Sequence, residues 1–162
     1  MNMNRTVQIK LLYYSLLLLI VTSIVSCASE PTTPIAGYSS AIGEKAAMTA
    51  VAMIGRPYKY RGDSPEGFDC SGLVRYSYLA SGMDVPHNTK ALRRSTRLVD
   101  SGKMQKGDLL FFSERGGKYS HVGIYLGNNI FVHAPSTGGK VRKESLLDPY
   151  WKRTFLEARR FD

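Results

Sequence analysis

The sequence predicts one α+β domain in which N-terminal helices pack on a central antiparallel sheet. Apolar residues recur at helical spacing between positions 41 and 99 of the 162-residue chain. From position 108 onward, short runs of apolar and aromatic residues alternate with turn residues, which is typical of strands. Because the helical patterns come first and the strand patterns follow, they favour an α+β fold with helices packed on an antiparallel sheet.

Three helices are expected in the first half of the domain. The first ends at the Gly-Arg-Pro sequence 55–57, since glycine and proline stop helices. A glycine-containing loop is expected over 58–68. Asp69 is the expected N-cap of the second helix, which ends at Ser-Gly 81–82. The predicted helical segments are 41–54, 70–80 and 90–99.

Strands are expected in the second half of the domain. Two of them flank the sequence Gly-Asn-Asn at 127–129, which is typical of a tight hairpin turn. The remaining strands are separated by glycine- and serine-containing connections. The predicted strands are 108–112, 121–126, 130–133, 140–143 and 155–160.

The N-terminal segment is typical of an export signal. Arg5 and Lys10 precede 15 uncharged and mostly apolar residues at 11–25. A membrane-spanning helix needs about 20 such residues, whereas the apolar part of a signal peptide needs about 7–15. We therefore expect residues 1–26 to be a signal peptide, which leaves 136 residues for the mature protein.

The end of this segment, Ile-Val-Ser-Cys at 24–27, resembles the bacterial lipobox, in which the cysteine is lipidated and becomes the mature N-terminus. The alternative is an ordinary signal peptide with a chance cysteine. A lipid on Cys27 would hold the protein on a membrane surface without spanning it. Because Ala28 rather than Asp follows, the resemblance favours the outer membrane, with the protein facing the periplasm. Residues 27–40 would then be a flexible tether and 41–162 the folded domain.

The chain is basic, with a formal net charge of +9. Nucleic acid is one class of partner for such a charge, but export makes it a poor candidate, and we expect no nucleic-acid partner. Anionic cell-wall polymers, lipid head groups and a simple solvated basic face remain as interpretations. We expect a monomer.

Cysteine usage singles out one thiol. The chain has two cysteines, so lipidation of Cys27 would leave Cys70 free in an oxidising compartment. A buried apolar cysteine is the alternative, and the neighbours Asp69 and Ser71 make it less attractive. Cys70 would begin a helix, where unpaired backbone amides and the helix dipole favour a thiolate.

Two histidines could complete a catalytic site with this thiol. His121 begins one predicted strand, and His133 lies on the next, 12 positions further along the chain. This spacing is compatible with neighbouring rings across a hairpin, so that one nitrogen of His121 bonds to His133 and the other faces the thiolate. A cysteine nucleophile needs a base and a polar group that orients the base. The sequence therefore predicts a cysteine hydrolase.

Five motifs in order resemble the NlpC-type cell-wall peptidases, a papain-like family of exported cysteine hydrolases. Together they extend the resemblance over about 41–162, and five weak patterns in the family's order form a specific signal. The motifs are Gly-Arg-Pro-Tyr-Lys-Tyr-Arg-Gly (55–62), Phe-Asp-Cys-Ser-Gly-Leu-Val (68–74), Lys-Gly-Asp-Leu-Leu-Phe-Phe (106–112), Ser-His-Val-Gly-Ile-Tyr-Leu-Gly (120–127) and His-Ala (133–134).

The resemblance implies a papain-like fold and a role for each site residue. It makes Cys70 the nucleophile, His121 the general base and acid, and His133 the orienting group. It also implies that Tyr58 helps to hold the oxyanion or the substrate. The remaining implied site residues are Asp69 and Ser71, which would line a pocket for the amine end of the substrate.

The implied reaction is hydrolysis of stem or cross-bridge peptides of peptidoglycan through a thioester, without a cofactor. Lipoprotein members of the family that act as murein DD- and LD-endopeptidases have this chemistry. The scissile bond stays open because the chain departs from the family near the expected groove. Pro-His-Asn-Thr stands at 86–89 where relatives commonly have Arg followed by Ser or Thr, and Leu92 replaces a common glutamine.

Other interpretations give these residues plainer roles. His87 would be a surface loop residue, and Tyr60 would pack on the core. A cysteine and two histidines could bind zinc, but the chain has no CxxC or HxxxH pair, and we expect no metal. A non-catalytic cell-wall binding module on the same fold, and an acyltransferase or amidase acting on lipid or small amides, are alternative functions.

Overall fold

The structure is a computed structural model that describes residues 39–114, 116–137 and 139–162. The predicted signal peptide, Cys27 and nearly all of the predicted tether lie outside the described residues, so these predictions stay predictions. The helices are α2 (Ser40–Ala52), α3 (Cys70–Leu79), α4 (Thr89–Arg94) and α5 (Pro149–Thr154), with a 3-10 turn at Ser101–Lys103. The strands are β1 (Asp63–Ser64), β2 (Gly67–Phe68), β3 (Arg97–Val99), β4 (Leu109–Glu114), β5 (Gly117–Gly127), β6 (Ile130–His133), β7 (Arg142–Ser145) and β8 (Phe155–Arg160).

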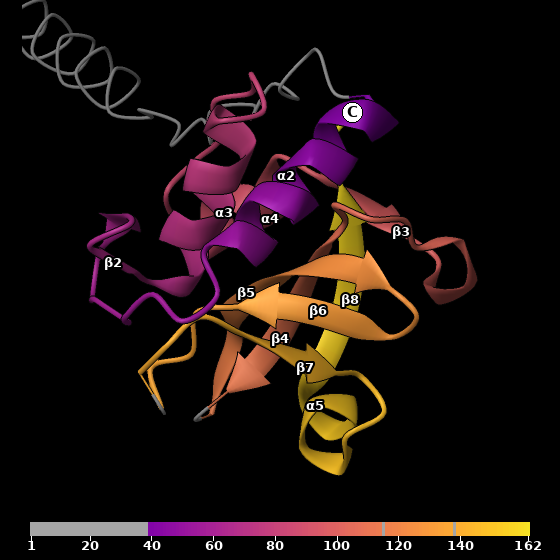
Figure 1. The fold of residues 1–162 in the computed structure, drawn as a ribbon. Helices are drawn as coiled ribbons and strands as arrows, with labels where there is room; N and C mark the ends of the chain where they lie inside the picture. The colour runs from indigo at the N-terminus through magenta and orange to yellow at the C-terminus, as the bar shows by residue number, and fades with distance from the viewer. Residues whose placement is uncertain (1–38, 115, 138) are drawn as a thin grey trace, which may run out of the picture. The chain divides into compact units, whose positions relative to one another are not determined.

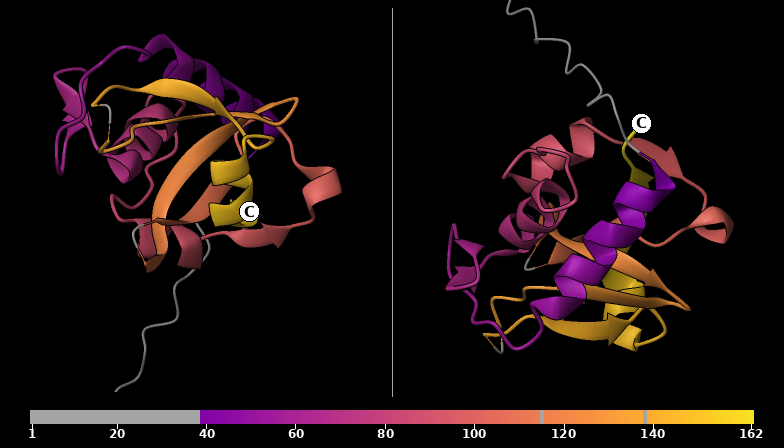
Figure 2. Two further views of the ribbon diagram at one scale, coloured as in Figure 1. Left: turned by 90° about the horizontal axis from the view of Figure 1, so that it is seen from below. Right: turned by 45° about the horizontal axis from the view of Figure 1, so that its top comes forward.

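One antiparallel sheet organises the described residues. Its six strands lie in the order β3-β8-β4-β5-β6-β7, and every neighbouring pair is antiparallel. Helices α2, α3 and α4 lie on one side of the sheet and α5 on the other (Figures 1 and 2). The predicted α+β class, with helices packed on a central antiparallel sheet, is therefore confirmed.

Apolar side chains fill both faces of the sheet because they alternate along its central strands. Phe111, Val122 and Ile124 pack against the helical side, and Phe112 and Phe131 pack against Trp151 of α5. Side chains alternate between the two faces of a strand, so consecutive apolar residues in β4 serve both cores. The short helix α5 thus closes a face that would otherwise expose aromatic rings.

The predicted hairpin between β5 and β6 is present. Asn128 and Asn129 have φ angles of 51° and 59°, the left-handed conformation that asparagine tolerates and that two-residue hairpin turns require. The turn sets a register in which Ile124 pairs with Val132. This register brings the start of β5 and the end of β6 to the same end of the sheet.

Several local predictions were wrong. The predicted helix 90–99 stops at Arg94, because the Ser95 and Thr96 hydroxyls bond carbonyls of the preceding turn and Arg97–Val99 pair with β8 as strand β3. The predicted loop 58–68 contains the small hairpin β1-β2, and α5 was not expected.

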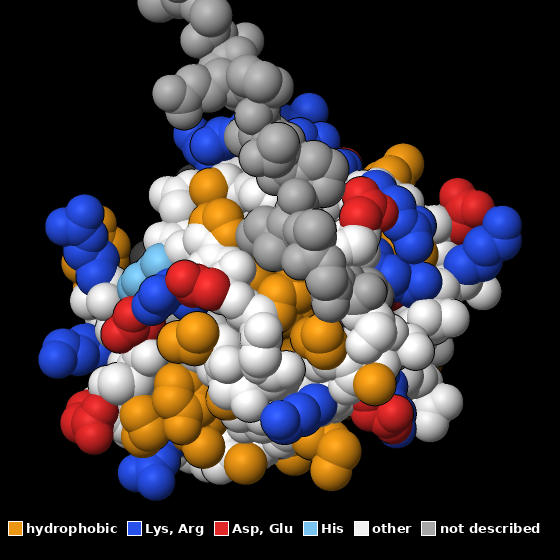
Figure 3. Space-filling model, turned by 90° about the horizontal axis from the view of Figure 1, so that it is seen from above, with side chains coloured by type: hydrophobic (Ala, Val, Ile, Leu, Met, Phe, Trp, Pro, Cys, Tyr) orange, Lys and Arg blue, Asp and Glu red, His pale blue; other side chains and the backbone are white. Residues whose placement is uncertain are grey.

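The surface of the domain mixes charge and apolar groups. On the face shown in Figure 3, Lys and Arg side chains lie in separate groups, several of them beside acidic side chains. Arg97–Asp162 and Lys106–Glu44 are ion pairs of this exposed kind. No helix in the described part of the chain is long and apolar enough to span a membrane.

A buried ion pair joins the start of β4 to the end of β8. Asp108 is fully buried, and its two oxygens lie 2.6 and 2.8 Å from Nε and Nη2 of Arg160. Asp108→Asn is expected to lower the free energy of unfolding by about 3–5 kcal/mol, because neutralising one member of a buried pair leaves the other charge uncompensated. Urea unfolding measures this loss. Asp100→Asn, which removes an exposed pair with Lys103, is the control, and an equal loss there would contradict the argument.

Candidate active site

Cys70 is placed by the start of helix α3. The Asp69 side chain caps this helix by accepting a hydrogen bond from the Gly72 N–H at 2.7 Å. The first turn packs so closely on the preceding loop that a Cβ at position 72 would collide with the Gly62 carbonyl. The predicted cap is therefore confirmed, and the thiol is held at the positive end of a helix dipole.

The Asp69 carboxylate also joins the two walls of the site. It accepts hydrogen bonds from the Ser71 hydroxyl at 2.9 Å and from the Arg61 N–H at 3.0 Å. His87 Nε2 lies 3.2 Å from the same carboxylate. Asp69 therefore connects helix α3, the loop before it and the segment before α4. His87 lies in a loop, as expected, but it forms part of the site wall rather than a plain surface position.

The rings of His121 and His133 are in direct contact. His121 Nε2 lies 2.7 Å from His133 Nδ1, and both residues are buried. Because Ile124 pairs with Val132, the two histidines are diagonal neighbours on one face of the hairpin. Trp151 lies edge-on to His133, with ring centroids 4.8 Å apart, and holds that ring in place. The expected proximity of the two rings is observed.

The helix start was expected to favour a thiolate, but burial outweighs it and the thiol is neutral at rest. Burial raises the pKa of Cys70 to about 11, and the nearby Asp69 charge adds to this effect. The Thr89 hydroxyl, whose Oγ1 lies 3.8 Å from Sγ, and the backbone of Val122 act in the opposite direction. Val122 directly follows His121, so the thiol lies against the strand that carries the candidate base.

The histidine pair is also neutral at rest. Burial lowers the pKa of His121 to about 4, partly offset by the Glu114 carboxylate. Burial and the neighbouring His121 lower the pKa of His133 still further. Among buried side-chain nitrogen and oxygen atoms of the described residues, His133 Nε2 is the one without a hydrogen-bond partner.

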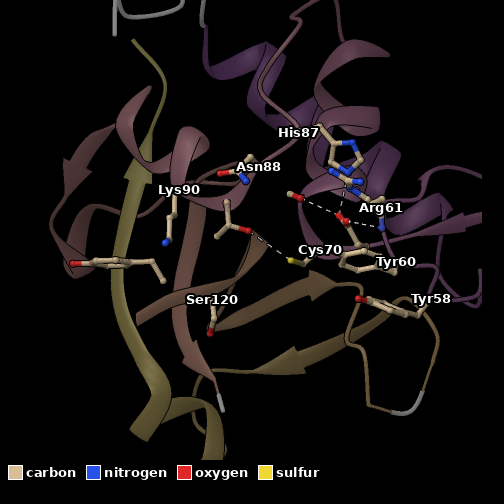
Figure 4. A pocket seen from close by; sticks show the side chains of 12 residues that line it. Tyr58, Tyr60, Arg61, Cys70, His87, Asn88, Lys90 and Ser120 are labelled. Atoms are coloured by element: carbon tan, nitrogen blue, oxygen red, sulfur yellow. Dashed lines mark hydrogen bonds and ion pairs between the residues drawn. The ribbon is translucent and has the colours of Figure 1, made fainter. Parts of the chain in front are cut away.

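Two cavities meet at Cys70. The larger, of about 610 Å³, is lined mainly by polar side chains, and both Asp69 and Ser71 contribute to it. In Figure 4 the Cys70 sulfur lies between Tyr58 and Tyr60 on one side and Asn88 and Lys90 on the other. The residues that line the smaller cavity, of about 270 Å³, are Tyr58, Cys70, Glu114, Gly117, Ser120, His121, Ala134 and Ser136.

The structure thus brings the predicted site residues of the domain together: Tyr58, Asp69, Cys70, Ser71 and His121 line the two cavities, and His133 is buried in contact with His121. Tyr58, beside the thiol, lines both cavities, as Cys70 does. Tyr60 is 76% exposed at the rim, so its expected packing on the core was wrong. Sequence reasoning missed Glu114, which no motif singles out. Among the described residues, no group of three or more His, Cys, Asp or Glu side chains could hold a metal ion.

Comparison with solved structures places this geometry among known proteins. An NlpC/P60 family protein from Bacillus cereus aligns with a TM-score of 0.69 and 30% identity, covering 80% of this chain and 42% of that one. The NlpC/P60 domain of the peptidoglycan hydrolase SagA aligns with a TM-score of 0.63 and 35% identity, covering 74% and 98%.

Sequence relatives lead to the same group. The murein DD-endopeptidase MepH of Escherichia coli is 39% identical over 112 residues, which are 66% of this chain and 41% of that protein. A probable endopeptidase NlpC homolog of Haemophilus influenzae is 36% identical over 124 residues, 75% and 65% of the two chains. The chain thus spans roughly half the length of the relatives it matches. The NlpC/P60 family model matches residues 55–160, which include the thiol and both histidines, and the chain belongs to the NlpC/P60 family.

Proposed function

We propose that the protein is a peptidoglycan hydrolase, a thiol-dependent endopeptidase that cleaves stem or cross-bridge peptides of the bacterial cell wall. One observation carries this proposal. Cys70 and His121 open into the same cavity while His133 holds Nε2 of His121 at 2.7 Å. Membership of the NlpC/P60 family and relatives named murein DD-endopeptidases support the choice of substrate.

The chemistry is acyl transfer with a base that works on a neutral thiol. His121 Nδ1 takes the thiol proton, and the Cys70 sulfur attacks the carbonyl carbon of the scissile amide. The tetrahedral intermediate collapses when His121 returns that proton to the leaving amine, which leaves a thioester on Cys70. Water then gives a proton to His121 and attacks the thioester, and the carboxylic acid leaves as the thiol regains its proton.

The groove supplies the groups that this reaction needs. The backbone N–H of Cys70, at the start of α3, can donate a hydrogen bond to the oxyanion that forms near the positive end of the helix dipole. The Tyr58 hydroxyl is a second candidate donor to this oxyanion. Asp69 and Ser71 offer acceptors to a positively charged amine in the larger cavity. The substrate would therefore lie across Cys70, with its amine end toward Asp69.

Digestion of purified peptidoglycan, with products separated and weighed by mass spectrometry, tests the proposal. The full-length protein in detergent is compared with its Cys70→Ala variant. New peptide fragments from the wild type alone are expected, and their masses identify the bond cut. Unchanged stems and cross-bridges in both samples would reject the peptidase function. The protein would then be a non-catalytic binding module or an enzyme that acts on another acyl substrate.

Lipidation and membrane location are proposed independently of the peptidase activity. The lipobox-like sequence favours a lipid on Cys27 and an outer-membrane position facing the periplasm. Wild-type protein is expected in the membrane fraction, with the added mass of acyl chains at its N-terminus. Cys27→Ser should remove that mass, whereas Cys70→Ser, which deletes the other thiol, should keep it. Acylation that persists in Cys27→Ser would show that residues 24–27 are not a lipobox.

A further inference from the structure

The Glu114 side chain lies against the candidate base. Glu114 ends strand β4, and its Oε2 is 3.3 Å from His121 Nδ1. Its other oxygen accepts a hydrogen bond from the Tyr150 hydroxyl at 2.8 Å. Ser120 holds the Glu114 backbone, since the Ser120 hydroxyl bonds both the N–H and the carbonyl of that residue. The Glu114 side chain is thus held at its carboxylate by Tyr150 and at its backbone by Ser120.

The nitrogen that Glu114 faces is the one that must exchange protons with the thiol. His133 occupies Nε2 of His121, which leaves Nδ1 for Cys70. Both Glu114 and Cys70 line the smaller cavity together with His121. A proton that arrives on Nδ1 therefore finds a carboxylate within hydrogen-bond reach.

The charges around the ring determine how readily it becomes an imidazolium. Burial and the Arg142 charge on β7 oppose protonation of His121. The Glu114 carboxylate favours protonation most strongly, and the Asp69 carboxylate favours it to a smaller extent. The neutral neighbours are His133 on β6, Cys70 on α3, and the rings of Phe112 and Trp151.

Glu114 acts selectively on the base. The charge that disfavours ionisation of the Cys70 thiol is Asp69, whereas Glu114 faces the ring. Stabilising the imidazolium more than it destabilises the thiolate lowers the cost of moving the proton between them. This matters in a buried site where the thiol and the base are both neutral at rest, because proton transfer there creates two charges away from water.

We propose that Glu114 is a positioning residue for this reaction: its carboxylate accepts a hydrogen bond from the Nδ1–H that forms on His121 when Cys70 gives up its proton, and so orients and stabilises the imidazolium. This inference rests on the proposed peptidase function and adds a residue to it. Glu114 touches no reacting atom of the substrate and acts through His121.

The pH dependence of cleavage tests this role. Glu114→Gln keeps the size of the side chain and removes its charge. We expect kcat/KM to fall about tenfold, mainly in kcat, because one pKa unit on His121 is a tenfold change in imidazolium population. At low pH, cleavage slows because His121 is already protonated and cannot accept the thiol proton. This acidic limb of the profile should move to lower pH in Glu114→Gln, since removal of a negative charge lowers the pKa of His121. Unchanged or raised kcat/KM would overturn the proposal.

A measurement without substrate separates this inference from the peptidase function. The ring nitrogen shifts of His121, followed by NMR in the full-length protein, report its pKa directly. We expect a lower pKa of His121 in Glu114→Gln than in the wild type, and the wild-type pKa in Glu44→Gln, which removes an equal charge from the exposed side of helix α2. No difference between the variants would overturn the role of Glu114. A shift in a protein that cleaves no peptidoglycan would instead reject the proposed function and leave the contact standing.

Discussion

Replacing Cys70 with alanine is expected to abolish peptidoglycan cleavage while the domain stays folded. Loss of the nucleophile removes the thioester route altogether, and comparable replacements in hydrolases with a covalent intermediate lower kcat by about 10⁴–10⁶. The stability cost should be small, about 1 kcal/mol, because the contacts of the thiol with Thr89 and the Val122 backbone are weak sulfur hydrogen bonds and alanine suits a helix start as well as cysteine does. Fragment yield and thermal unfolding of the same preparations measure the two effects.

A serine at position 70 is the informative companion to this variant. It keeps a nucleophilic oxygen in nearly the same place but has a much higher pKa than a thiol, so His121 cannot readily deprotonate it. Cys70→Ser should therefore retain very little activity. Cleavage by Cys70→Ala at more than a few per cent of the wild-type rate would show that another group carries the reaction.

Replacing His121 with alanine is expected to lower kcat by about 10³ or more, since the thiol at rest is neutral and needs a base to lose its proton. Burial keeps the pKa of Cys70 at about 11, so water alone would leave almost no thiolate at neutral pH. His133→Ala should cost less, because orientation is easier to replace than proton transfer. The measurement is kcat for each variant on one peptidoglycan preparation.

Both histidine variants need a control for folding, because both rings are buried, and the need is greatest for His133. Its ring is fully buried against Phe131 and Trp151, so alanine would leave a cavity and cost about 2–4 kcal/mol of stability. His133→Asn fills part of that space and keeps a polar atom for His121, and it should recover much of the activity lost in His133→Ala. Equal losses in His121→Ala and His133→Ala, both folded, would mean that the division into base and orienting group is wrong.

The site was largely predictable because its parts carry local signals. The Asp69 cap, the helix that Cys70 begins and the Asn-Asn turn between the histidine strands are each specified within a few positions of the chain. Such short-range signals survive in the folded protein because tertiary packing agrees with them. Two strands joined by a two-residue turn can hardly avoid being neighbours, which is why the contact between His121 and His133 followed from spacing alone.

What sequence reasoning missed depends on contacts made through space. Strand β3 forms because Arg97–Val99 meet the C-terminal strand β8, about 60 positions away, and nothing local announces that pairing. His87 reaches Asp69 across 18 positions, and Glu114 meets Tyr150 across 36. Helix α5 did carry signals, an Asp148 cap followed by Pro149, but six residues are too few for a periodic pattern.

The turn at Asn128 and Asn129 also limits how this chain can change length. Successive side chains of a strand point to opposite faces, so one residue added to or removed from this turn would rotate His133 toward the helical side of the sheet. Every residue of the site would still be present in such a variant, yet the two imidazoles would lie on opposite faces. Single-residue insertions between positions 127 and 130 should therefore be far more damaging than most substitutions there, because the distance along the chain between these histidines is itself part of the site.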